Sequence, residues 1–180
     1  MTSSWCFALA LRIPAWSEET ALTVNGQAVA VTKGYTQIER TWSAGDTVEL
    51  LLDMRTQVVR PIAYGTQILT NRPCWKANYI ATTFDIEHPD AGEYIALQRR
   101  PVVLAQDARL GCSLNAPAPV RITPDGCVDV TLEENAASFA HLVCAQVPLE
   151  NGETMTLVDY GSAGKTWSED SQIAAWIRIS

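Results

Sequence analysis

Residues 7–13 read Phe-Ala-Leu-Ala-Leu-Arg-Ile, and this stretch decides the fold class. Its large apolar side chains occupy every second position, while alanine and arginine occupy the positions between them. A period of two is typical of a β-strand whose two faces differ in polarity. The alternation returns at residues 35–42, Tyr-Thr-Gln-Ile-Glu-Arg-Thr-Trp, so the sequence predicts strands rather than helices.

Turn signals separate these stretches from further strands. Asn25-Gly26 lies between the runs 22–24 and 27–31 and predicts a hairpin, and residues 43–46 predict a turn before the run 47–52. Other short runs predict strands at residues 58–62, 67–70, 94–98, 102–106, 120–123, 127–132, 141–147, 155–158 and 173–179. No segment predicts a convincing helix, since residues 132–141 are too few and too polar. We therefore expect an all-β protein, a β-sandwich built from two packed units of which the first is incomplete.

The rhythm of strands and turns breaks once. Residues 71–92 contain Pro73, Pro89 and Gly92 and predict a long loop at the seam between two sheet units. The resulting division is a partial middle sandwich at 1–60, connecting strands and a long loop at 61–93, and a C-terminal sandwich at 94–180.

Charge and composition exclude several partners and compartments. The 180 residues include 13 basic and 20 acidic ones, a net charge of -7, which argues against nucleic acid and anionic membranes as partners. No apolar run reaches the roughly 18 residues that span a membrane, and no basic segment precedes residues 5–11 as in a signal peptide. We expect a soluble, cytoplasmic chain.

The five cysteines show no metal-binding or redox spacing. Their number is odd and no CxxC pair occurs among Cys6, Cys74, Cys112, Cys127 and Cys144. We expect mostly buried thiols in a reducing compartment, whereas one or two disulfides stay open for an exported protein. The sequence predicts no cofactor.

The stretch 159–167, Asp-Tyr-Gly-Ser-Ala-Gly-Lys-Thr-Trp, resembles a phosphate-binding loop on first sight. That loop requires a glycine five positions before its second glycine, and Asp159 stands five positions before Gly164. A carboxylate there would also repel a triphosphate. We expect a glycine-rich connection between two terminal strands, with Lys165 on the surface.

The adjacent acidic pairs are weak candidates for glycosidic cleavage. Neighbouring residues of an extended chain point to opposite faces, so neither Glu18-Glu19 nor Glu133-Glu134 forms an acid and base couple by itself. We expect solvated loop residues. A couple assembled from distant strands stays open.

Two histidines offer further alternatives. Asp85, Glu87 and His88 could ligate a cation, although decoration of a loop is the expected role. His141 lies in an apolar run, and we expect a half-buried, hydrogen-bonded strand residue, because the sequence contains no G-x-S-x-G motif. We assign no catalytic residue and no metal ligand.

Tryptophans could stack on sugar rings. Trp16 and Trp42 are expected as packing anchors, whereas Trp75 and Trp167 lie in predicted loops, where binding residues concentrate. Trp75 and Trp167 are therefore the carbohydrate-binding candidates.

Several motifs together resemble those of a known family, glycoside hydrolase family 127, the β-L-arabinofuranosidase-like proteins. The motifs occur in the family's order and are Leu-Arg-Ile-Pro-Ala-Trp at 11–16, Val-Asn-Gly at 24–26, Gly-Tyr-Thr-Gln-Ile-Glu-Arg-Thr-Trp at 34–42 and Gly-Asp-Thr-Val at 45–48. The segments 96–105, 157–160, 164–167 and 175–177 are similar to later strands of the family. The resemblance covers most of the chain.

The resemblance implies an architecture and a role. Such proteins carry their active site in an N-terminal (α/α)₆ helical barrel, which β-sandwich domains follow. Their zinc site of Glu and Cys ligands and their cysteine nucleophile include an adjacent Cys-Cys pair, which this sequence lacks. We therefore expect a non-catalytic C-terminal β-sandwich region of a bacterial protein. The protein would act on plant-type glycans that contain L-arabinofuranose, with a helical-barrel catalytic domain as partner in cis or trans.

Two other functions remain open from the sequence. One is a stand-alone carbohydrate-binding β-sandwich module, and the other is a sandwich enzyme with an assembled carboxylate couple. An incomplete first sandwich also predicts an exposed sheet edge and an apolar face, which favour a homodimer.

Overall fold

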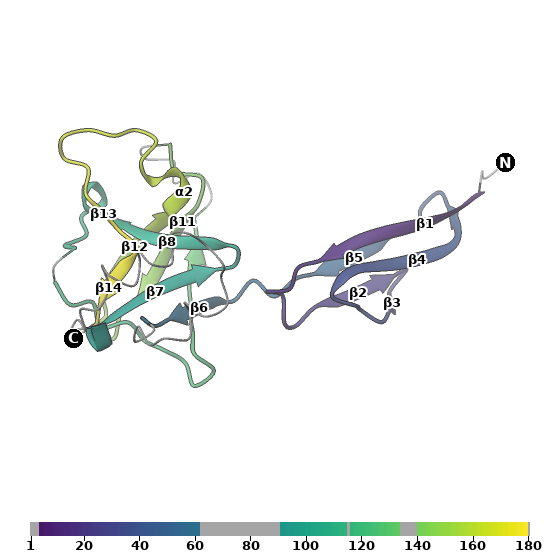
Figure 1. The fold of residues 1–180 in the computed structure, drawn as a ribbon, viewed down its shortest axis with the longest axis horizontal. Helices are drawn as coiled ribbons and strands as arrows, with labels where there is room; N and C mark the ends of the chain where they lie inside the picture. The colour runs from purple at the N-terminus through teal and green to yellow at the C-terminus, as the bar shows by residue number, and fades with distance from the viewer. Residues whose placement is uncertain (1–3, 62–90, 115, 134–139, 180) are drawn as a thin grey trace, which may run out of the picture. The chain divides into compact units, whose positions relative to one another are not determined.

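The computed structural model describes residues 4–61, 91–114, 116–133 and 140–179. It divides the chain into two units, Met1–Arg55 and Thr56–Ser180. Both units are built from β-strands (Figure 1). The predicted strand at 67–70 and nearly all of the predicted loop at 71–92 lie outside the described residues.

The first unit contains two small antiparallel sheets. Strand β1, Ser4–Ile13, pairs with β4, Gly34–Ser43, along its whole length. Strand β2, Ala21–Val24, pairs with both β3, Gln27–Ala28, and β5, Val48–Leu51. The β2–β3 hairpin turns at Asn25-Gly26 with φ angles of 50° and 77°, as the two-residue turn requires.

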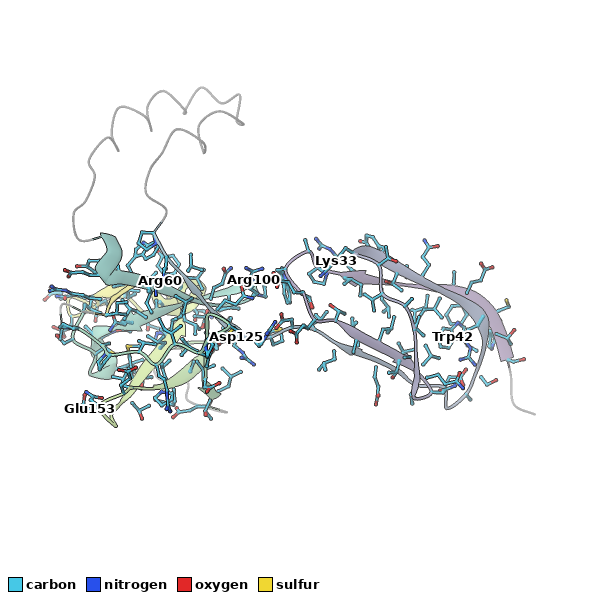
Figure 2. All side chains as sticks on the ribbon, turned by 90° about the horizontal axis from the view of Figure 1, so that it is seen from below. Lys33, Trp42, Arg60, Arg100, Asp125 and Glu153 are labelled. Carbon is cyan, nitrogen blue, oxygen red and sulfur yellow. The ribbon has the colours of Figure 1, made fainter. Side chains whose placement is uncertain are left out.

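The core of the first unit lies between its two sheets. It is formed by Ile13, Leu22, Val24 and Trp42, which are buried. Figure 2 shows the sheets as two layers with Trp42 between them. The Trp42 ring stacks on Phe7 with centroids 5.7 Å apart, and its Nε1–H donates to the Phe7 carbonyl at 3.1 Å.

The second unit is a larger, curled antiparallel sheet. Its main strand order is β10-β11-β12-β8-β7-β6-β9, with β13 paired to β8 and β14 paired to β7. The strands are β6 Thr56–Val59, β7 Tyr94–Arg99, β8 Val102–Asp107, β9 Cys127–Val128, β10 Thr131–Leu132, β11 Cys144–Pro148, β12 Thr154–Asp159, β13 Ile173–Ala174 and β14 Trp176–Arg178. Among the described residues, short helical turns also occur between strands, η1 Ala91–Glu93, η2 Ala108–Leu110 and α2 Tyr160–Ala163.

One apolar core holds the second unit together. Leu97 of β7 lies opposite Leu104 of β8, and both are fully buried. The other members of this cluster are Ile95, Ala118, Val120, Val128, Ala145, Val147, Met155, Leu157 and Ile177. Because large aliphatic side chains come from both central and flanking strands, burial of this cluster fixes how the sheet curls.

The all-β, sandwich-like fold class is confirmed, and some elements differ from the expectation. The predicted strand at 120–123 makes a single bridge, Val120 to Leu149, and the predicted strand at 127–132 is interrupted into β9 and β10. Helix α2 was not expected. The sequence places the first domain boundary after residue 60, whereas the structure divides the chain after Arg55, since β6 pairs with β7 and β9 of the second unit.

Candidate functional site

A buried cluster of polar side chains, Asp107, Arg109 and His141, lies at the end of β8. The Asp107 side chain is completely buried and accepts from Arg109 Nε at 2.9 Å. His141 Nε2 lies 3.2 Å from the other carboxylate oxygen. Hydrogen bonding to Arg109 holds the pKa of Asp107 below its usual value, although burial acts in the opposite direction.

Arg109 connects this cluster to the Gly-Lys-Thr stretch. Its Nη2 donates to the Ala163 carbonyl at 3.2 Å and its Nη1 to the Thr166 carbonyl at 2.5 Å. The guanidinium therefore satisfies one carboxylate and two backbone carbonyls at once. The position of residues 163–166 is set by a buried arginine of another strand end.

Asp159 stabilises the same stretch through its hydrogen bonds. It is the N-cap of α2 and accepts from the Ser162 N–H at 2.9 Å and the Ser162 hydroxyl at 2.6 Å. It also accepts from the N–H groups of Leu142 and Val143, at 3.0 and 2.8 Å. Burial raises the pKa of Asp159, but the hydrogen bonds from Ser162, Val143 and Leu142 outweigh it and keep the pKa below its usual value.

These contacts connect the segment before β11, the end of β12 and the end of β8. A catalytic acid or base must reach the proton that it transfers. The Asp107, Arg109 and His141 side chains are 0, 5 and 1% exposed, so a substrate atom cannot reach them without rearrangement of the fold. The chemistry of this cluster is the mutual neutralisation of the buried Asp107 carboxylate and Arg109 guanidinium.

His141 differs from the expectation in two respects. It is buried rather than half-buried, and it precedes β11 instead of lying within a strand. Its carboxylate neighbour, Asp107, comes from a distant part of the chain. The apolar neighbours in the sequence could not indicate that contact.

A local sequence signal does exist for the aspartates. The spacing Asp-x-Arg occurs at Asp53 and Arg55 and again at Asp107 and Arg109. In both places the aspartate accepts from the backbone N–H and from the side chain of the arginine two residues later. The sequence-based predictions did not include this repeated arrangement, although the Asp-x-Arg spacing is visible in the sequence.

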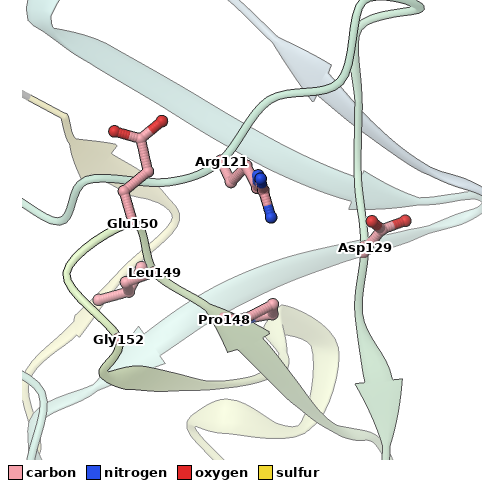
Figure 3. Close-up of a pocket in the computed structure, with 6 residues that line it drawn as sticks. All are labelled: Arg121, Asp129, Pro148, Leu149, Glu150 and Gly152. Carbon is pink, nitrogen blue, oxygen red and sulfur yellow. The ribbon is translucent and has the colours of Figure 1, made fainter.

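An open groove on the second unit is a candidate binding site. Its volume is about 400 Å³, and its lining residues are Arg121, Asp129, Pro148, Leu149, Glu150 and Gly152. Figure 3 shows Arg121 between Glu150 and Asp129. The mixed charges suit hydrogen bonds to a polar ligand such as a sugar.

The groove lacks the setting of a glycosidase acid. A general acid that protonates a leaving group is held in an apolar or shielded pocket. Both Asp129 and Glu150 are exposed, and none of the described residues that line the groove is aromatic. The groove has polar groups that could contact a ligand. An acid and base couple requires one shielded and one solvated carboxyl group, whereas the carboxylates of Asp129 and Glu150 are both exposed.

Of the predicted carbohydrate contacts, Trp167 is 66% exposed and follows the segment that Arg109 holds. Trp75 lies outside the described residues, as do Asp85, Glu87, His88 and Glu134. Glu18, Glu19 and Glu133 are exposed, as expected. The structure does not bring the predicted site residues together in one place within its described part.

The described cysteines lie in different environments. Cys127 and Cys144 are buried and Cys112 is half-buried, whereas Cys6 is exposed. Burial raises the pKa of the Cys112 and Cys144 thiols. Within the described ranges no three His, Cys, Asp or Glu side chains gather in a way that could hold a metal, and no helix is long and apolar enough to cross a bilayer.

The first unit of the chain matches a known protein domain. The sequence model of the β-L-arabinofuranosidase GH127 middle domain matches residues 3–54. No curated protein sequence matches the chain.

Solved structures share the fold over nearly the whole chain. A GH127 β-L-arabinofuranosidase from Geobacillus stearothermophilus T6 is 21% identical, with a TM-score of 0.54 over 99% of this chain and 27% of its own. A glycoside hydrolase is 20% identical, with a TM-score of 0.59 over 97% of this chain and 28% of its own. A GH127 β-arabinofuranosidase is 19% identical, with a TM-score of 0.52 over 99% and 28%.

The chain therefore spans just over a quarter of the length of the solved structures that it matches. The matched segment contains the whole of the first unit's sheet pairs, β1 with β4 and β2 with β3 and β5. The resemblance to glycoside hydrolase family 127 is thus confirmed: residues 3–54 match the family's middle domain, and the chain as a whole has the fold of a region found in GH127 β-L-arabinofuranosidase structures.

Proposed function

We propose that this chain is a non-catalytic β-sandwich region of a GH127-like protein that acts on plant-type glycans containing L-arabinofuranose. Its role is to support the helical-barrel catalytic domain. The match of residues 3–54 to the GH127 middle domain is the observation that carries this proposal. The similar structures hold the fold inside longer chains, which supports a region of a larger protein over a stand-alone carbohydrate-binding module.

The use of the buried carboxylates supports a structural role. The Asp53 carboxylate pairs with Arg55, and the Asp107 carboxylate contacts Arg109 and His141. The Asp159 carboxylate accepts hydrogen bonds from backbone N–H groups and from Ser162. Each of these groups stabilises its own surroundings. None of them faces the groove, whose carboxylates are those of Asp129 and Glu150.

The first experiment tests the absence of catalysis. The 180-residue chain is incubated with p-nitrophenyl β-L-arabinofuranoside and with arabinofuranosyl disaccharides, and we expect no release above the buffer blank. Turnover that Asp129→Asn or Glu150→Gln abolishes would overturn the proposal in favour of a sandwich enzyme.

The second experiment tests the supporting role. In the Geobacillus stearothermophilus enzyme, the region structurally equivalent to this chain is deleted in one variant and replaced by this chain in another. We expect the deletion to lower the melting temperature and the soluble yield, and the chimera to restore part of both. A chimera that is no better than the deletion would contradict the supporting role.

Trp167 is the residue that we assign to sugar contact within this role. Its exposed ring follows a segment whose carbonyls are held by Arg109, so stacking on a sugar would cost little ordering of the loop. Titration of arabino-oligosaccharides by calorimetry should show weak binding that Trp167→Ala removes and Trp176→Ala, a change at another exposed tryptophan, preserves. Equal binding by the parent and both variants would remove Trp167 from the site.

A further inference from the structure

A long connection in the second unit begins at α2 and ends where β13 pairs with β8. Figure 1 shows it as the yellow-green loop between α2 and β13, and residues 160–172 of this loop are called the strap below. Arg109 binds two carbonyls in the first half of the strap, and the Ala108 N–H donates to the Gln172 carbonyl at 2.9 Å. Both halves of the strap are therefore attached to the same short stretch that follows β8. A loop whose ends lie close together forms a compact unit of its own.

The middle of the strap has little apolar burial. Seven consecutive residues, 164–170, are exposed, and the large aromatic side chain among them, Trp167, is 66% exposed. The strands β7 and β8, in contrast, carry the fully buried Leu97 and Leu104. Segments with few buried apolar contacts open at a lower free energy than core strands do. The strap should therefore open more readily than the sheet to which it is attached.

Hydrogen bonds inside the strap shape two local turns. The Lys165 N–H donates to the Ser162 carbonyl at 2.9 Å. The Ser168 N–H donates to Ser171 Oγ at 2.9 Å, and the Ser171 N–H donates to the Ser168 carbonyl at 3.1 Å. Because donor and acceptor both belong to the strap, these bonds do not attach it to the sheet.

Arg109 attaches the strap to the end of β8. Its Nη1 and Nη2 donate to the carbonyls of Thr166 and Ala163, which lie on either side of Lys165. The buried Asp107 carboxylate accepts from Arg109 Nε at 2.9 Å and so orients the guanidinium. A planar guanidinium can serve one carboxylate and two carbonyls at once, whereas an ammonium group is a compact point charge without this fork.

We propose that the strap opens as one unit while the sheet stays folded, and that Arg109 holds it closed. In the closed strap, the backbone is fixed on both sides of Lys165 up to Thr166, and Trp167 follows directly. Arg109 thereby determines how much of the time Trp167 is held in one position. The consequence for sugar contact at Trp167 rests on the proposed function, whereas the opening of the strap does not.

Cleavage by a lysine-specific protease measures the opening in the intact 180-residue chain. The bond after Lys165 must leave the contacts with Arg109 to enter a protease, so its cleavage reports the open population. Arg109→Lys keeps a positive charge beside Asp107 but loses the fork, and we expect cleavage after Lys165 to accelerate at least about tenfold. Arg178→Lys, the same exchange in the partly exposed pair with Glu93, is the matched control and should leave the rate unchanged.

Mass spectrometry separates local opening from unfolding of the second unit. In Arg109→Lys, position 109 is itself a new cleavage site, and it is buried beside Asp107, so it is cut only when the end of β8 unfolds. We expect cuts after Lys165 in chains that are intact at position 109. Equal rates of cutting at the two sites would overturn the local opening, and an unchanged rate after Lys165 would remove Arg109 as the residue that holds the strap.

Hydrogen exchange gives a second measurement on the unchanged parent chain. The amides of Lys165, Ser168 and Ser171 donate hydrogen bonds within the strap. We expect these amides to share one level of protection that depends little on urea, whereas the amides of β7 and β8 should depend on urea steeply. This measurement decides alone if circular dichroism shows that Arg109→Lys does not fold. Strap amides with the urea dependence of β8 would contradict opening as a separate unit.

A sugar titration keeps this inference apart from the proposed function. An arabino-oligosaccharide that stacks on Trp167 of the closed strap should slow cleavage after Lys165 in the parent chain and not in Trp167→Ala. Accelerated cleavage in Arg109→Lys without protection by the sugar would count against sugar contact at Trp167, and it would support Arg109 as the residue that holds the strap closed.

Discussion

At the residue scale, buried aspartates stabilise the fold by pairing with neighbouring arginines. Asp107 is the most enclosed of them, since Arg109 and His141 both contact its carboxylate and all three side chains are buried. A buried charge that loses its partner retains the cost of its removal from water. Asp107 and Arg109 should therefore act as one unit in stability measurements.

Replacing Asp107 with Asn tests this dependence. The variant leaves the buried Arg109 guanidinium without its counter-charge, and we expect the free energy of unfolding to fall by about 3 kcal/mol. Urea unfolding followed by circular dichroism measures the change. Glu93→Gln, which breaks the partly exposed pair with Arg178, is the control and should cost under about 1 kcal/mol. Equal effects would show that burial of the Asp107 pair is unimportant.

Acidification should destabilise the second unit through the same aspartates. The native pKa values of Asp107 and Asp159 are lowered, so below the usual aspartate pKa of about 3.9 the unfolded chain binds protons first. The stability that these groups give is complete above that pH and is lost as the pH falls through their native values. Urea unfolding at pH 7, 5, 4 and 3 should show this decline, and Asp159→Asn should make it shallower. An unchanged slope in Asp159→Asn would contradict the assignment.

At the element scale, an aromatic contact adds to the backbone pairing of β1 with β4. Trp42 stacks on Phe7, donates to its carbonyl and lies 5.0 Å from the Arg40 guanidinium carbon. These contacts stabilise the end of the β1–β4 sheet that contains Trp42. A sheet of only two strands is marginally stable without further packing. The stability of the first unit should therefore be sensitive to this side chain.

Trp42→Ala measures the contribution of that contact. Loss of a buried tryptophan leaves a cavity, and we expect destabilisation of the first unit by about 3 kcal/mol or more. Hydrogen exchange of β1 and β4 amides should accelerate, while the amides of β7 and β8 keep their protection. Tyr35→Ala, an exposed change on the same strand, should leave exchange nearly unaltered. Acceleration in β7 and β8 would indicate that the units unfold together.

At the scale of the whole molecule, the two units have separate cores. The cluster that includes Ile95, Leu104 and Leu157 belongs entirely to residues after Arg55. The first unit has a smaller core around Leu22 and Trp42. A chain with two cores is expected to unfold in two steps.

Residues 56–180, expressed alone, should fold. We expect a β-type circular dichroism spectrum and a cooperative urea transition with a midpoint close to the upper transition of the parent chain, because the cut removes none of its core residues. The parent chain should show an additional, lower transition from the first unit. A fragment that lacks a cooperative transition would show that its fold requires residues 1–55.

The fold class, most of the strands and the family resemblance could be predicted from the sequence. Alternation at residues 7–13 and 35–42 and the Asn25-Gly26 turn depend on neighbours in the chain, and local backbone chemistry is readable at that range. Only the tertiary structure decided how Asp107 meets His141, how Arg109 holds the Gly-Lys-Thr stretch and which face of β1 stays exposed. Those features arise where segments far apart in sequence pack together, and burial of a charge or an aromatic ring depends on that packing rather than on adjacent residues.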